Sequence, residues 1–245
     1  MMSHRSFILF QILTMLLCFI GALFVQWSVL NIFISSIVYY LMFSLGVSLM
    51  MHRFWAHKEF QFKSSLLEVV FSAFAIMVSR GSPLAWVHIH REHHAHADTD
   101  KDPHRPSKFK FFSFKTAKIV EFKPFIVRDM LTPRHKMLHE RYWYFVGIYP
   151  TLLFCIGGLS AVYFAYLIPI VTVQIVQDLW NHFSHVECGY INNKLKNNSR
   201  NVPWLWPLIF GEAWHNNHHA NPRQSVKSNW WEFDPVGDLI KIISK

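Results

Sequence analysis

Charged residues are scarce in this sequence. Asp, Glu, Lys and Arg fill 16% of its 245 positions, whereas apolar residues fill 52%. An average soluble domain carries about 25% charged residues. Residues 6–51 contain none of the four charged types, and neither do residues 142–177. These absences exclude an ordinary soluble domain and indicate an all-α integral membrane protein.

Cysteine is scarce as well. The three cysteines, Cys18, Cys155 and Cys188, form no CxxC pair. Structural zinc sites usually include cysteine, and disulfide frameworks need regularly spaced cysteines. The sequence therefore favours neither. It also has one ExxH motif, EAWH at residues 212–215, and no second. Soluble di-iron bundles need two such motifs, so that class is excluded too.

The two uncharged blocks predict the membrane topology. One crossing takes about 20 residues, so each block holds two helices joined by a tight turn. The predicted crossings are, approximately, residues 6–26, 28–51, 142–158 and 161–180, with turns expected near Trp27 and near residues 157–161. All 24 Lys and Arg residues lie outside these crossings. Because cytoplasmic loops carry the excess of Lys and Arg, we expect two hairpins with both termini in the cytoplasm.

This topology divides the chain into a membrane part and a cytoplasmic part. The cytoplasmic segments are residues 52–141 and 181–245, and we expect them to form a helical cap over the four crossings. We expect residues 1–245 to make one domain, anchored in a lipid bilayer. The positive charge, +9 at pH 7 with histidine neutral, is explained by topology, so no nucleic-acid partner is expected.

Histidine is abundant and clustered. Thirteen of the 16 histidines fall into HRFWAH (52–57), residues 88–104, NHFSH (181–185) and HNNHH (215–219). The predicted topology brings all four groups to the cytoplasmic face of the membrane. HREHH and HNNHH both place histidines at i, i+3 and i+4, on one face of a helix. Imidazole suits Zn, Cu, Fe and Ni, and this many ligands indicates two ions.

A polar stripe at the end of the fourth predicted crossing adds to this pattern. Asn181 and His185 share a helical face that continues back through Gln177 and Asp178 to Gln174. Polar groups in a membrane helix are costly and usually functional. The neighbouring acids are expected to orient imidazoles; they are Glu92, Asp98, Asp100, Asp102, Glu187 and Glu212. By contrast, His4, His135 and His139 stand apart, and we expect them to be solvated.

The three motifs HRFWAH, HREHH and HNNHH resemble the histidine boxes of membrane fatty acid desaturases. GSPLAWVHIHREHHAHADTDKDPH and NHFSH are similar to the stearoyl-type branch, the acyl-CoA and acyl-lipid Δ9 desaturases. The resemblance covers roughly residues 50–222. It implies two iron ions and nine metal ligands, which are His52, His57, His90, His93, His94, His185, His215, His218 and His219. It also implies that Asn181 holds a metal through a water molecule.

The activity implied by this resemblance is insertion of a cis double bond into a saturated acyl chain with O₂ and two electrons. A saturated chain offers no charge to polarise and no acidic proton, so its chemistry needs an oxidising metal cofactor and a protein that aims the chain. Trp86, four residues before His90, is a candidate tunnel wall or an interfacial anchor.

The implied partners are a fatty acyl-CoA or acyl-lipid substrate, O₂ and a separate electron donor, either a ferredoxin or a small haem protein. The compact length resembles bacterial members, which favours a bacterial inner membrane over the endoplasmic reticulum. Two alternatives stay open at this stage. One is a histidine-box hydroxylase of lipids or alkanes, and the other is a membrane metal transporter.

Overall fold

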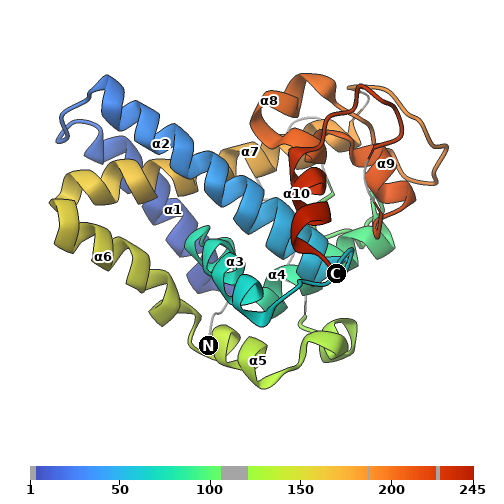
Figure 1. Cartoon of the computed structure of the whole chain (residues 1–245), viewed down its shortest axis with the longest axis horizontal. Helices are drawn as coiled ribbons and strands as arrows, with labels where there is room; N and C mark the ends of the chain where they lie inside the picture. The colour runs from blue at the N-terminus through green and yellow to red at the C-terminus, as the bar shows by residue number, and fades with distance from the viewer. Residues whose placement is uncertain (1–3, 106–120, 187, 225–226) are drawn as a thin grey trace.

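The computed structural model describes residues 4–105, 121–186, 188–224 and 227–245. Throughout these ranges the regular elements are helices, and β pairing is limited to two isolated bridges, Phe62 with Ser244 and Tyr190 with Asn201. The prediction of an all-α protein is therefore confirmed. Figure 1 shows the long apolar helices together on one side and the short helices of the C-terminal region on the other.

The first hairpin consists of α1 (His4–Gly21) and α2 (Val29–Leu41). Ser28 caps the N-terminus of α2, because its side chain accepts a hydrogen bond from the backbone N–H of Asn31. It continues without interruption into η1 (Met42–Ala56), a segment with π-helical hydrogen bonding. The joined stretch Val29–Ala56 is long and apolar enough to cross a membrane, whereas α1 is a shorter apolar helix.

The second hairpin consists of α6 (Tyr142–Val162), the π-helical η4 (Tyr163–Leu167) and α7 (Ile168–His185). The stretch Tyr142–His185 is also long and apolar enough to cross a membrane. Gly157 and Gly158 break it with non-helical backbone angles. Gly158 has φ +61° and ψ −153°, a combination that side chains disfavour. The break lies in the predicted turn and at the same end of the molecule as the α1–α2 turn (Figure 1).

An apolar helix that the sequence analysis did not single out, α3 (Ser65–Met77), packs against η1. A Cβ on Gly46 would lie 2.8 Å from the carbonyl oxygen of Phe74, so glycine allows the two backbones to approach closely. Leu66 and Val69 on α3 are exposed. With 13 residues, α3 is too short for a crossing of about 20 residues.

The remaining helices carry most of the histidines. α4 (Pro83–His96) is capped at its N-terminus by Ser82, whose Oγ accepts a hydrogen bond from the backbone N–H of Ala85. η3 (Pro124–Met130) and α5 (Pro133–Glu140) follow. The C-terminal region contains η5 (Pro203–Leu205), α8 (Trp206–Ile209), η6 (Phe210–Ala213), α9 (His215–Ala220) and α10 (Pro235–Ile243). α4 packs against η1, which brings the first two histidine groups together. α10 packs against both η1 and η6.

Candidate metal centre

The fold gathers nine histidines into two groups. Within each group, one ring nitrogen from every residue lies within 4.8 Å of the others. The first group, called the five-histidine cluster below, contains His52, His57, His90, His94 and His218. The second, the four-histidine cluster, contains His93, His185, His215 and His219. These are the same nine residues that the sequence analysis assigned as metal ligands.

The five-histidine cluster joins the end of η1 to α4 and α9. The Nε2 atom of His52 lies 2.9 Å from that of His218, and the Nε2 atoms of His57 and His90 are 2.7 Å apart. His94 Nε2 lies 3.1 Å from His218 Nε2. The helical spacing predicted for HREHH is present in α4, because its i and i+4 members both enter this cluster.

The four-histidine cluster joins α4, α9 and the end of α7. His215 Nε2 lies 2.9 Å from His185 Nε2 and 3.0 Å from His219 Nε2. His93, the i+3 member of HREHH, turns to this cluster rather than to the first. The two clusters are adjacent, since the rings of His94 and His219 stack with centroids 4.3 Å apart.

Three carboxylates hold imidazoles by the nitrogen that faces away from the clusters. Asp102 oxygens lie 2.9 and 3.0 Å from His93 Nδ1, and Asp98 oxygens lie 3.1 and 3.2 Å from His185 Nδ1. Glu212 Oε2 lies 2.8 Å from His52 Nδ1. Asp102 and Asp98 accept the Nδ1 protons of His93 and His185, so the Nε2 lone pairs of these two rings point into the cluster. The contact of Glu212 with His52 is an ion pair by distance.

Other predicted acids serve different partners. Glu92 contacts Lys123 and His96, and Asp100 pairs with Arg105 near the surface. Glu187 lies outside the described residues. Three of the acids predicted to orient imidazoles therefore contact the nine histidines, through hydrogen bonds or ion pairs, within the described residues. They are Asp98, Asp102 and Glu212.

Burial favours the neutral form of several cluster imidazoles. It lowers the pKa well below the usual value for His90, His94, His215, His218 and His219, with further lowering from neighbouring histidines. Burial raises the pKa of the Glu212 carboxyl, but His52 and Arg53 outweigh it and lower that pKa to about 2. Neutral imidazoles beside ionised carboxylates are the protonation states that metal binding requires.

The donor set fits a pair of metal ions. If His185 donates from Nδ1 to Asp98, its Nε2 atom can only accept, so His215 must donate. His215 Nε2 has one proton at most and also faces His219 Nε2. Hydrogen bonds within a cluster therefore cannot satisfy all the converging lone pairs, whereas a shared cation can. Imidazole donors without thiolate suit iron among other divalent metals.

A buried ion-pair network lies behind His52. The Arg53 guanidinium donates to Asp234 at 2.7 and 3.0 Å and to Glu212 at 3.2 Å. Arg53 is 1% exposed, and both acids are buried. Ser48 also donates to Glu212. No sequence motif indicated this network, because its members come from η1, η6 and the start of α10.

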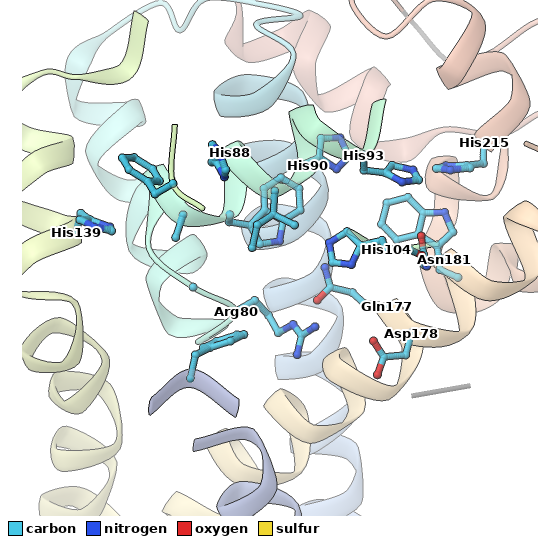
Figure 2. Close-up of a pocket in the computed structure, with 17 residues that line it drawn as sticks. Arg80, His88, His90, His93, His104, His139, Gln177, Asp178, Asn181 and His215 are labelled. Carbon is cyan, nitrogen blue, oxygen red and sulfur yellow. Dashed lines mark hydrogen bonds between the residues drawn. The ribbon is translucent and has the colours of Figure 1, made fainter. Parts of the chain in front are cut away.

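A cavity of about 310 Å³ adjoins the clusters. Figure 2 shows that α4 and α7 supply most of its labelled residues, with His90, His93 and His215 at its cluster side. Trp86 lines this cavity and stacks on His90, with ring centroids 4.8 Å apart. Asn181 lines it too, and its Nδ2 atom donates to the carbonyl oxygen of His104 at 2.8 Å.

Two of the histidines expected to be solvated are not. His139 is half-buried on α5, its Nδ1 atom lies 2.6 Å from Ser82 Oγ, and it lines the cavity. His135 is also partly buried, and its ring lies 5.9 Å from that of Trp55. The prediction failed because α5 packs on α4, a contact that a polar sequence context does not reveal. The side chain of His4 lies outside the described part.

The fold and site together define a helical protein of the histidine-rich, metal-binding class, since two imidazole clusters adjoin a cavity and the chain has two long apolar stretches. Residues 26–241 match the family described as "Fatty acid desaturase". The chain belongs to the fatty acid desaturase family, and the protein is a fatty acyl desaturase. This membership decides against a metal transporter.

Relatives from plants and cyanobacteria show what this chain resembles. It is 33% identical over 238 residues to "Delta-9 acyl-lipid desaturase 1" of Arabidopsis thaliana, covering 93% of this chain and 76% of the relative. It is 32% identical over 243 residues to "sn-1 stearoyl-lipid 9-desaturase" of Anabaena variabilis, covering 91% and 86%. A third, the chloroplastic "Palmitoyl-monogalactosyldiacylglycerol delta-7 desaturase" of Arabidopsis thaliana, is 31% identical over 81% of this chain and 56% of the relative.

Proposed function

We propose that this protein inserts a cis Δ9 double bond into a saturated fatty acyl chain carried by a membrane lipid. Acyl-CoA is the alternative substrate. Its co-substrates are O₂ and two electrons. The convergence of nine histidines beside one cavity carries this proposal, since the acyl chain then lies against the metal site. The Δ9 position and the lipid carrier are supported by the printed names of two relatives.

The proposed cofactor is a pair of iron ions, one held by each histidine cluster. His52, His57, His90, His94 and His218 would hold the first, and His93, His185, His215 and His219 the second. Asn181 is proposed to reach the second ion through a water molecule. When bound, the irons supply the reductive activation of O₂ that unactivated CH₂ groups require.

The protein's own residues position the chain and exclude water. Trp86 presents its indole to the cavity while stacked on His90, so it is proposed to form the wall that aims the chain. Burial of His90 and His93 at the cavity wall keeps bulk water from the reacting carbons. Asp98, Asp102 and Glu212 keep three of the rings oriented.

The test of function is expression in a host unable to make unsaturated lipids, followed by mapping of the double bond. We expect cis monounsaturated chains with the bond at Δ9 in membrane lipids. Mass analysis separates desaturation, a loss of two hydrogens, from hydroxylation, a gain of one oxygen. Lipids that gain oxygen without unsaturation would contradict the proposal.

Freshly purified protein is expected to contain two irons per chain, because the described ligands form two separate imidazole clusters. Elemental analysis measures this content. Zinc generally outranks Fe²⁺ in affinity for such ligands and can displace it during overexpression, so activity after iron addition is measured in parallel. One zinc and no iron, with no activity on iron addition, would rule out the di-iron site.

We further propose a single domain with four crossings and both termini and the metal centre in the cytoplasm of a bacterium. The one-sided distribution of Lys and Arg supports this topology. A separate ferredoxin or small haem protein is the proposed electron donor. Reporter tags at either terminus and at Lys118, which lies outside the described residues, are expected to read cytoplasmic. A periplasmic signal from any of them would contradict the topology.

A further inference from the structure

One side of the reaction cavity is polar, although a saturated alkyl chain needs only apolar walls. Arg80 lies just before α4, and Gln177 and Asp178 lie on α7; all three line the cavity. Figure 2 shows the Arg80 guanidinium directed towards Gln177 and Asp178. None of the three belongs to the histidine clusters or to the carboxylates that orient them.

Arg80 holds unsatisfied hydrogen-bond donors. Its Nε and Nη1 atoms are shielded from solvent and have no hydrogen-bond partner in the described part of the chain. The Oε1 atom of Gln177 is likewise shielded and without such a partner there. Leaving buried polar groups unpaired costs free energy, and more for a charged group. Donors and an acceptor that face one cavity therefore indicate a polar occupant.

The charges of the site indicate which polar occupant it takes. Burial lowers the pKa of Arg80, while Asp178 acts in the opposite direction. Arginine nevertheless stays protonated in proteins. Because the Asp178 carboxylate lines the same cavity, an anion such as a phosphate or free carboxylate would place a second negative charge beside it. A neutral oxygen satisfies the Arg80 donors without adding a second buried negative charge.

We propose that Arg80 donates hydrogen bonds to a neutral oxygen of the acyl substrate inside the reaction cavity; if that oxygen is a hydroxyl, its proton also satisfies Gln177 Oε1. This inference rests on the proposed function and adds the feature by which the substrate is recognised. The oxygen belongs either to the ester linkage of the acyl chain or to a hydroxyl borne by the chain. With either source, Arg80 would fix which carbons of the acyl chain lie beside the metal site.

The experiment measures binding rather than turnover. Full-length, iron-loaded protein in detergent is titrated without O₂ or electron donor, using octadecane, methyl stearate and a methyl stearate with a mid-chain hydroxyl. A hydrogen bond from a charged donor is expected to make the recognised oxygen-bearing probe bind about tenfold or more tighter than octadecane. Arg80→Met is expected to remove this preference, and Arg80→Gln, which keeps a donor, to restore part of it.

The control is Arg134→Met, which removes a partly buried arginine paired with Glu68 outside the cavity. It is expected to keep the wild-type preference. A preference for both esters identifies the ester linkage as the source, and a preference for the hydroxylated ester alone identifies the chain hydroxyl. Equal binding of all three probes by the wild type, or an unchanged preference in Arg80→Met, overturns the inference. Lipid desaturation, assayed separately, reports on the proposed function itself.

Discussion

Replacement of His185 by alanine is expected to abolish desaturation and to lower the iron content while the protein still inserts into membranes. His185 joins the four-histidine cluster through His215, 2.9 Å away, and its other ring nitrogen faces Asp98. Removal of one of four nitrogens would leave the second proposed iron with too few ligands. Replacement of a solvated histidine at the surface would instead change stability by about 0.5 kcal/mol or less. Product analysis and iron determination on purified protein measure the two effects.

His96→Ala is the matched control for this variant. His96 also lies in the histidine-rich stretch but outside both clusters, and its ring stands 3.7 Å from Glu92. It is expected to keep activity and iron. Asn181→Ala is expected to lose less activity than His185→Ala, because Asn181 is proposed to reach the metal only through a water molecule. Near-normal activity and full iron content in His185→Ala would remove His185 from the set of ligands.

Replacement of Asp234 by alanine is expected to cost about 3–5 kcal/mol of stability, because it removes one of the two carboxylates to which the buried Arg53 donates hydrogen bonds. Asp234 is fully buried and makes both a 2.7 Å and a 3.0 Å hydrogen bond with Arg53. It also caps α10 by accepting the N–H of Gly237. A marked fall in the thermal unfolding midpoint in detergent is the measurement.

Asp238→Ala provides the comparison within α10. Asp238 is 54% exposed and pairs with Lys227 and Lys241 at the surface. Surface pairs of this kind add little to stability, so the unfolding midpoint is expected to stay nearly unchanged. If Asp234→Ala and Asp238→Ala shifted the midpoint equally, the buried Arg53 pair would not be the stabilising contact that its geometry indicates.

The sequence by itself determined the parts of this protein that depend on composition and on local spacing. The uncharged blocks indicated membrane-spanning helices, and Gly157 and Gly158 do break the second block where a turn was predicted. The i, i+3, i+4 spacing of HREHH indicated a helix that presents three imidazoles, and α4 has that form. These features are readable because helical periodicity fixes which neighbouring residues share a face.

Only the tertiary structure decided which distant residues meet. His93 and His94 are adjacent in sequence but enter different clusters, because successive side chains of the helix α4 point in different directions. Arg53 meets Asp234 across 181 positions, and His139 lines the cavity through the packing of α5 on α4. No sequence motif indicated Arg80, and only the folded chain places it in one cavity with Gln177 and Asp178. Such contacts depend on how helices pack, and local sequence spacing does not encode that packing.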